Sequence, residues 1–216
     1  MILVPVKDTS TAKQRLAGWL DQAARTGLAR TMLGDVLEAL AEYGSEDVGL
    51  VTRDGFALEL AQSYGFQVIR DEANTSETDA IAMATEACLS AGVEDILVIP
   101  GDIPLMEPDD VRAIYESAPT RGSVLVPSRD KRGTNAALRR PATLFGLRFG
   151  NDSFLPHLAA ATNADASCLV LSLPRIALDI DTPDDLKHLA NSPGEKLSQQ
   201  LARKLLQLDP IAAERP

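Results

Sequence analysis

Three aspartates occupy positions where carboxylates can hold a magnesium ion. Asp102 follows the apolar run Ile96–Ile99 and lies between two prolines, so a strand would deliver this carboxylate to its end without burying a bare charge. Asp179 and Asp181 alternate with apolar residues, and a period of two places both carboxylates on one face of an extended segment. Carboxylates together with substrate phosphates are the usual ligands of Mg²⁺ in enzymes. The pattern therefore predicts a magnesium site formed by Asp102, Asp179 and Asp181.

Two of these aspartates also have structural explanations. Asp181 can act as the N-cap of a helix predicted over Pro183–Ala190, with Thr182 and Pro183 in its first turn. Asp102 can serve the fold alone. The sequence leaves these alternatives open.

The segment Lys7–Leu16 gathers positive charge in an acidic chain. It holds Lys7, Lys13 and Arg15 together with three hydroxyl side chains, and we expect it to lead from a first strand into a helix. Backbone N–H groups at a helix start, hydroxyl groups and cationic side chains suit a triphosphate. The segment contains no glycine, so it is neither a Walker loop nor a GxGxxG turn. A solvated basic helix start is the alternative interpretation.

Two glycine-containing polar stretches follow later in the chain. Thr134 and Asn135 come directly after a glycine, and Gly150 precedes Ser153, which stands where a helix N-cap is expected. Such N–H and hydroxyl groups can receive a phosphate or a carboxylate of an acceptor molecule. A turn followed by a capped helix would explain the same residues.

Histidine and cysteine chemistry is poorly represented. The chain has two histidines: His157 follows Ser153 by one helical turn and can face the same ligand or be an ordinary histidine, whereas His188 is expected on a helix surface. No GxSxG or HExxH pattern occurs, which argues against a nucleophilic triad or a zinc site. The two cysteines, Cys88 and Cys168, are too few for a disulfide framework.

Length and charge limit the class of protein. The 216 residues are 45% hydrophobic and 24% charged, which is typical of one soluble domain. Lys and Arg total 21 against 31 Asp and Glu, giving a net charge of -10, the wrong sign for binding nucleic acid or an anionic membrane surface. The apolar start is far too short for a membrane span. We therefore expect a reduced, cytoplasmic protein that binds neither nucleic acid nor membrane.

Short apolar runs alternate with helical patterns along most of the chain. This alternation predicts an α/β fold with a mostly parallel sheet and helices on both faces. Ligands of such sheets bind outside the carboxyl ends of the strands, where the residues above are found. After Ser128 the pattern is less regular, which indicates a mixed edge or a β-insertion. The predicted strands are Ile2–Val6, Val48–Thr52, Phe66–Ile69, Ile96–Ile99, Ser123–Val126 and Cys168–Leu173.

Taken in order, these motifs resemble the CofC/FbiD family of guanylyltransferases from residue 1 to about residue 190. The resemblance implies a Rossmann-like fold of the nucleotide-diphospho-sugar transferase type, as in the MobA-like molybdenum-cofactor guanylyltransferases. It also implies transfer of GMP from GTP to 2-phospho-L-lactate, phosphoenolpyruvate or 3-phospho-D-glycerate in the biosynthesis of coenzyme F-420. The motifs are Val4–Lys7, Ala12–Leu16, Pro100–Leu105, Gly133–Leu138, Phe149–Phe154 and Leu178–Pro183.

The resemblance assigns roles to individual residues, with GTP, Mg²⁺ and a small phosphorylated acid as partners. Lys13 and Asp102 are expected to be catalytic, and Asp102, Asp179 and Asp181 to hold magnesium. The acceptor is expected at Thr134, Asn135, Gly150 and Ser153. GTP is expected at Lys7, Lys13, Arg15, Asn74, Ser76, Pro100 and Asp102.

The stretch Asn74–Ile81 departs from the family, which usually has Gly-Leu-Asn near the nucleotide. Glu77 or Asp79 can accept hydrogen bonds from guanine, or the two can favour the start of a helix over residues 79–91 through its dipole. Other readings of the whole chain are a nucleotidyltransferase for a molybdopterin or sugar phosphate, and a non-catalytic nucleotide-binding subunit. The first loop lacks the Gly-Gly pair typical of the molybdopterin enzymes.

The resemblance divides the chain into a single nucleotidyltransferase domain over residues 1–190 and a C-terminal linker with an amphipathic helix over residues 191–216. Leucines recur in the helix at intervals of four, four and three, so it has one apolar stripe. The stripe must pack on the domain or meet a second copy, and we expect a role in a homodimer. The leucines are Leu197, Leu201, Leu205 and Leu208.

Overall fold

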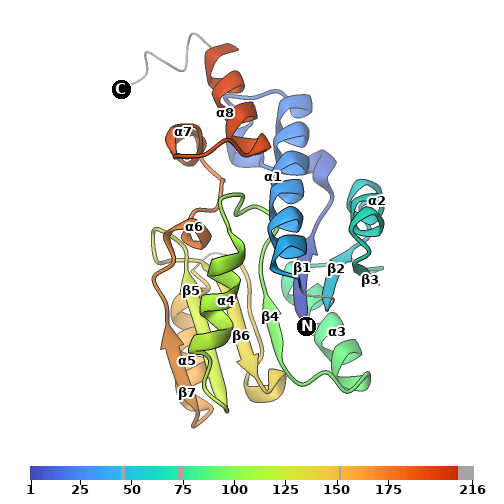
Figure 1. Ribbon diagram of the computed structural model, residues 1–216, viewed down its shortest axis with the longest axis vertical. Helices are drawn as coiled ribbons and strands as arrows, with labels where there is room; N and C mark the ends of the chain where they lie inside the picture. Colours follow the sequence, from blue (N-terminus) through green and yellow to red (C-terminus); the bar gives the residue numbers. More distant parts are fainter. Residues whose placement is uncertain (45–46, 73–74, 151, 209–216) are drawn as a thin grey trace.

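The computed structural model describes residues 1–44, 47–72, 75–150 and 152–208 (Figure 1). They form a seven-stranded sheet in the order β3-β2-β1-β4-β6-β5-β7. Of the described strands, only β6 is antiparallel to its neighbours, β4 and β5. The predicted α/β fold is confirmed. The strands are β1 Ile2–Val6, β2 Val48–Thr52, β3 Gln67–Arg70, β4 Ile96–Val98, β5 Gly122–Pro127, β6 Thr134–Arg140 and β7 Ser167–Val170.

The predicted strands recur with small shifts at their ends. The largest shift is in β7, which ends at Val170 and not at Leu173. The irregular region after Ser128 supplies both an inserted strand and an edge: antiparallel β6 lies between β4 and β5, and β7 forms the edge beside β5. Since β6 runs back from its hairpin with β5, its first residue, Thr134, lies at the edge where β4 and β5 end.

Helices cover both faces of the sheet, as predicted (Figure 1). Val4 shares a core with residues of α1, α2, α4 and α6, and its neighbour Leu3 shares the opposite core with residues of α3 and α5. Adjacent residues of one strand thus face opposite layers, as a period of two requires. Among the described helices, none has the length and apolar character needed to cross a membrane. The sheet-covering helices are α1 Gln22–Tyr43, α2 Gly55–Tyr64, α3 Glu77–Ser90, α4 Pro108–Ser117, α5 Phe154–Asn163 and α6 Pro174–Ala177.

Two further helices, α7 Pro183–Asn191 and α8 Leu197–Leu208, pack against α1 beyond the end of the sheet (Figure 1). Buried Asp35 of α1 accepts a hydrogen bond from the backbone N–H of Ser198 at 2.9 Å and so caps the start of α8. Leu201 and Leu205 are partly buried in this layer, whereas Leu197 is 63% exposed. The side chain of Leu208 and residues 209–216 lie outside the described residues. The boundary at residue 190 and the homodimer remain predictions.

The loop after β1 does not contain the predicted helix start. It forms two short 3-10 turns, η1 Thr9–Thr11 and η2 Gln14–Leu16, and α1 begins only at Gln22. Lys13 has a left-handed backbone with φ of 56°, which interrupts a right-handed helix. Asp21 caps α1 instead. The prediction of a helix N-terminus within the basic segment was therefore wrong, and the loop offers side chains rather than a helix end.

Candidate active site

Two cavities share a wall at the edge of the sheet where β1 and β4 end, the place where such sheets bind ligands. The polar cavity, of about 330 Å³, extends toward β6 and α5, and the loop cavity, of about 410 Å³, toward the loop after β1. The shared wall consists of Arg15, Glu77, Pro100, Asp102 and Asp181. The polar cavity is further lined by Ser128, Asp130, Arg132, Gly133, Thr134, Asn135, Phe149, Gly150, Asp152, Ser153 and Asp179, and the loop cavity by Pro5, Val6, Lys7, Thr9, Ala12, Lys13, Gln14, Ala29, Met32, Leu33 and Gly101.

Asp102 is placed by the turn that follows β4. A Cβ atom on Gly101 would lie 3.0 Å from Leu33 Cδ1, so glycine lets this turn approach α1 closely. The carbonyl oxygen of Asp102 accepts a hydrogen bond from the backbone N–H of Ile180 at 3.2 Å. This contact brings Asp102 beside the segment that carries Asp179 and Asp181.

Lys13 lies between two of the predicted magnesium ligands. Its Nζ is 2.6 Å from Asp102 Oδ2 and 3.0 Å from Asp181 Oδ1, and its side chain is only 7% exposed. Burial alone would lower the pKa of Lys13, but Asp102 and Asp181 outweigh it and raise the pKa above its usual value. The ammonium therefore stays charged and is held by the two carboxylates.

Asp181 does not cap α7. The N-cap is Thr182, which forms a capping box with Asp185, so the capping alternative for Asp181 was wrong. The Asp181 carboxylate instead pairs with Lys13 and with Arg15, whose Nη1 lies 3.2 Å from Asp181 Oδ2.

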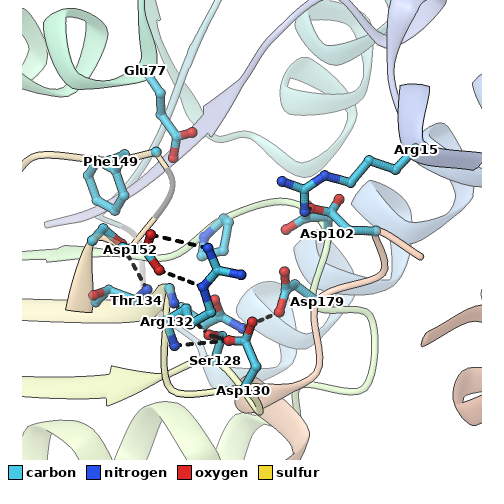
Figure 2. Close-up of a pocket in the computed structure, with 16 residues that line it drawn as sticks. Arg15, Glu77, Asp102, Ser128, Asp130, Arg132, Thr134, Phe149, Asp152 and Asp179 are labelled. Carbon is cyan, nitrogen blue, oxygen red and sulfur yellow. Dashed lines mark hydrogen bonds and ion pairs between the residues drawn. The ribbon is translucent and has the colours of Figure 1, made fainter. Parts of the chain in front are cut away.

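Asp179 faces the polar cavity beside Asp102 (Figure 2). Asn135 donates one amide hydrogen to Asp179 Oδ1 and another to the carbonyl oxygen of Ile176, both at 3.0 Å. Burial, reinforced by the charge of Asp102, raises the pKa of Asp179. Asn135 thus lines the predicted acceptor site, but both of its amide hydrogens are donated to the segment that carries Asp179.

The other predicted acceptor residues meet in the polar cavity. The pairing of β5 and β6 slips between Val126 and Pro127, an irregularity that lets Thr134 turn toward α5 while Asn135 turns toward α6. Ser153, at the start of α5, accepts a hydrogen bond from the backbone N–H of Thr134 at 3.1 Å. Gly150 has φ of 123°, a conformation that side chains rarely adopt. The structure therefore brings Thr134, Asn135, Gly150 and Ser153 together.

Several lining residues were not assigned a role from the sequence. Arg132 and Asp152 form an ion pair at the polar cavity, with Arg132 Nη2 and Asp152 Oδ2 3.1 Å apart (Figure 2). Asp130 accepts hydrogen bonds from the Ser128 hydroxyl at 2.6 Å and from the backbone N–H of Arg132 at 2.9 Å, which fixes the β5–β6 turn. An Asp-Lys-Arg-Gly turn beside Thr134 is a visible sequence signal, but its meeting with Asp152 depends on the fold.

The residues near the start of α3 divide between the helix cap and the cavities. The Ser76 hydroxyl accepts from the backbone N–H of Asp79 at 3.0 Å, so Ser76 caps α3 and, alone among the described predicted GTP ligands, lines neither cavity. Glu77 points into the polar cavity (Figure 2), where burial and the charge of Asp102 raise its pKa to about 7 although Lys7 and Lys13 oppose them. Asn74 lies outside the described residues.

The three predicted magnesium ligands, Asp102, Asp179 and Asp181, do not form a compact cluster of carboxylates in the described structure. Within the described part of the chain, no group of three or more His, Cys, Asp or Glu side chains is close enough to hold a metal ion. Asp102 and Asp181 nevertheless hold a cation between them, the Lys13 ammonium. Carboxylate oxygens are ligands that Mg²⁺ prefers, so Asp102 and Asp181 suit this ion, but the meeting of all three predicted aspartates around it stays a prediction.

The sheet, the cationic loop and the paired cavities define an α/β protein with cavities at the carboxyl ends of its strands, where such sheets bind their ligands. The family model described as "Guanylyl transferase CofC like" matches residues 1–211, and the chain belongs to this family. The phosphoenolpyruvate guanylyltransferase of Roseiflexus castenholzii is 38% identical over 204 residues, covering 94% of each chain. The 3-phospho-D-glycerate guanylyltransferase of Colwellia psychrerythraea is 34% identical over 193 residues, covering 88% of this chain and 90% of the other.

Solved structures agree on the fold. A protein of Desulfovibrio desulfuricans G20, provisionally classed as a nucleotide-diphospho-sugar transferase, aligns with a TM-score of 0.76 at 20% identity and covers 96% of each chain. The family and the type of fold that the motifs predicted are confirmed.

Proposed function

We propose that this protein transfers the GMP group of GTP to the phosphate of phosphoenolpyruvate and releases pyrophosphate. The observation that carries the proposal is the wall shared by the two cavities. GTP in the loop cavity and an acid in the polar cavity would meet at the wall that contains Asp102 and Asp181, two of the residues common to both cavities. The family relationship makes this a step in the biosynthesis of coenzyme F-420.

The reaction needs no protein nucleophile. A phosphate oxygen of the acid attacks the α-phosphorus of GTP, and the bond from that phosphorus to the bridging oxygen of pyrophosphate breaks. Catalysis then consists of holding the two substrates in line and neutralising their charge. Lys7, Lys13 and Arg15 line the loop cavity and supply positive charge to the triphosphate.

Mg²⁺, when bound, supplies further positive charge to the phosphates and reverses the local sign of an acidic site. Asp102, Asp179 and Asp181 are the residues that would hold it. Because Lys13 pairs with Asp102 and Asp181, we expect this ammonium to leave the aspartates and contact the triphosphate when the substrates bind.

This exchange of partners can be tested without turnover. Mn²⁺, titrated into the nucleotide-free protein and followed by electron paramagnetic resonance, should bind Lys13→Ala more tightly than the wild type, because the competing ammonium is gone. Lys204→Ala, on exposed α8 surface, serves as the matched control. Equal Mn²⁺ affinity in wild type and Lys13→Ala would contradict the assignment of this site to the metal.

We propose phosphoenolpyruvate as the acceptor because the relative that is 38% identical to this chain is named a phosphoenolpyruvate guanylyltransferase. Of the alternatives, 2-phospho-L-lactate has a methyl group in place of the methylene of phosphoenolpyruvate, which a pocket distinguishes weakly, and 3-phospho-D-glycerate has its phosphate displaced to the next carbon. Pyrophosphate release should be measured with GTP, Mg²⁺ and each acid in turn, with glucose 1-phosphate as a sugar-phosphate control.

The outcomes of this assay separate the possible functions. Fastest release with phosphoenolpyruvate supports the proposal, and fastest release with another acid replaces the acceptor. Release with glucose 1-phosphate alone would indicate a different nucleotidyltransferase, and no release with any acceptor would favour a non-catalytic subunit.

We also propose that the protein works in the cytoplasm, where GTP and phosphoenolpyruvate are available, and that it forms a homodimer. Leu197, which is 63% exposed on α8, supports the dimer because an isolated apolar side chain gains from a partner surface. Light scattering should give twice the chain mass for the wild type and a lower mass for Leu197→Asp. A monomeric wild type would contradict the dimer.

A further inference from the structure

His157 is a buried group that the proposed mechanism leaves unused. It lies in the first turn of α5, is 1% exposed and packs edge-on against the ring of Phe149. Its Nε2 accepts a hydrogen bond from the backbone N–H of Arg148 at 2.7 Å, and its Nδ1 lies 2.9 Å from Thr134 Oγ1. Both ring nitrogens are therefore engaged.

The contact with Arg148 decides which ring nitrogen carries the proton. A backbone N–H can only donate, so Nε2 must be the unprotonated nitrogen. The neutral ring then carries its proton on Nδ1 and donates it to Thr134. Burial, with the positive charge of Arg139, lowers the pKa of His157 to about 4, which keeps the ring neutral at pH 7.

The Nδ1–H group keeps the Thr134 hydroxyl from donating its proton to the ring. Because Thr134 Oγ1 accepts from the ring, its own proton must be donated elsewhere, and Thr134 lines the polar cavity. Ser153 Oγ is likewise used as an acceptor, by the backbone N–H of Thr134, and its proton remains available in the same cavity. This corner of the polar cavity thus offers two hydroxyl donors.

We propose that His157 is a positioning residue for the acceptor, which holds the Thr134 hydroxyl as a donor so that Thr134 and Ser153 together recognise an oxyanion. This inference rests on the proposed function. If the ring nitrogen were an acceptor, the Thr134 hydroxyl would donate its proton to the ring and offer only lone pairs to the cavity. The ring N–H prevents that orientation and leaves the proton for the oxyanion. His157 therefore acts on acceptor binding without touching the acceptor.

A double-mutant cycle tests this role through the KM of the acceptor. The amide oxygen of His157→Gln can still accept from Arg148, but this variant leaves no donor at the Nδ1 position. We expect His157→Gln to raise the acceptor KM roughly tenfold and to leave the GTP KM nearly unchanged. Thr134→Val should raise it similarly, and the double variant should be no worse than Thr134→Val. Additive effects, or equal rises in both KM values, would overturn the inference.

The ring proton can also be observed without any activity measurement. The chain has two histidines, so ¹⁵N-labelled histidine gives two ring systems in NMR spectra, and His188→Gln, at an exposed position, assigns them. We expect His157 to be neutral and protonated on Nδ1 at pH 7. A ring protonated on Nε2, or a charged ring, would overturn the inference even if His157→Gln did not fold.

The two levels of the proposal fail in different ways. If the wild type releases no pyrophosphate with any acid, the proposed function fails, and the role of His157 falls with it. If the wild type is active but the cycle is additive or the tautomer is different, only the role of His157 fails.

Discussion

The two cavities differ in how their polar groups are held before any substrate arrives. In the polar cavity, Thr134 and Ser153 are 6% and 4% exposed and are tied to one another and to His157. In the loop cavity, the cations lie on a segment of short 3-10 turns, and Lys13 is paired with the carboxylates of the shared wall. The hydroxyl groups of the polar cavity are therefore held in place in advance, whereas Lys13 would have to leave its two carboxylate partners to contact a nucleotide in the loop cavity.

The difference between the two cavities indicates where each substrate would obtain its binding energy. A fixed pair of hydroxyl donors costs little reorganisation and gives specificity for the shape of an oxyanion. The Lys13 ammonium would leave Asp102 and Asp181 only for a strongly charged ligand, such as a triphosphate with its metal ion. Substitutions in one cavity should therefore affect one substrate, and substitutions in the shared wall should affect both.

The largest effect is expected at the shared wall. Asp102→Asn should reduce kcat by about a hundredfold or more with both substrates saturating, because this carboxylate lies in the wall shared by the two proposed substrate cavities. Pyrophosphate release gives kcat, and circular dichroism verifies the fold. Asp184→Asn, whose side chain is 85% exposed, is the matched control. Near-normal Mg²⁺-dependent turnover in Asp102→Asn would show that this carboxylate is not part of the chemistry.

A smaller and more selective effect is expected in the loop cavity. Lys13→Ala should lower kcat/KM for GTP by about a hundredfold, since a buried charge facing the triphosphate is lost, and should change the acceptor KM much less. Initial rates at varied concentrations of each substrate give both values. Equal losses for GTP and for the acceptor would remove the distinction between the cavities.

The polar cavity should show the opposite selectivity. Ser153→Ala should weaken acceptor binding by about 1–3 kcal/mol, the usual loss when a buried hydrogen bond to a charged group is removed. Calorimetric titration with phosphoenolpyruvate measures this loss directly. Ser63→Ala, at an exposed position on α2, controls for the substitution itself. Unchanged acceptor affinity in folded Ser153→Ala would remove Ser153 from the site.

The last effect is on stability, not on catalysis, and concerns the buried His157 beside the polar cavity. The pKa of His157 is lowered from 6.5 to about 4 in the folded protein, so the unfolded chain binds more protons between these values. The free energy of unfolding should thus fall as the pH drops from about 6.5 to 4, by up to roughly 3 kcal/mol.

Urea denaturation at several pH values measures this slope. His157→Gln should lack the contribution, and His188→Gln should retain it, because His188 is exposed. The same slope in wild type and His157→Gln would mean that the ring is not held neutral by its surroundings.

Much of the fold was predictable because it depends on local pattern. Buried parallel strands need continuous apolar runs, and β1 and β2 were found at their observed limits for that reason. β6 was not recognised as a strand inside the sheet, since Thr134–Arg140 combines small residues and arginines whose burial depends on distant partners. Arg139, for example, is buried, and its guanidinium group donates hydrogen bonds to the carbonyl oxygens of Ala142 and Phe145 and to the Thr85 hydroxyl.

Site residues at strand ends, turns or caps were predictable from the sequence, whereas contacts between residues far apart in the sequence were not. Asp102 stands at a strand end that its sequence makes visible, and Thr134 and Ser153 stand beside turns and caps. The pairing of Lys13 with two aspartates, 89 and 168 residues away, has no local signal. His157 is similar, because only the fold shows that one ring nitrogen faces Arg148 and the other Thr134.

The proposed reaction requires that the two substrates occupy adjoining cavities at the same time. Calorimetric titration of phosphoenolpyruvate into protein saturated with Mg²⁺ and an unreactive GTP analogue, with a methylene group between the α- and β-phosphorus, tests this claim directly. We expect a ternary complex in which the acid binds at least as tightly as to the free protein, and binds more weakly in Ser153→Ala. Mutual exclusion of the acid and the analogue would contradict it.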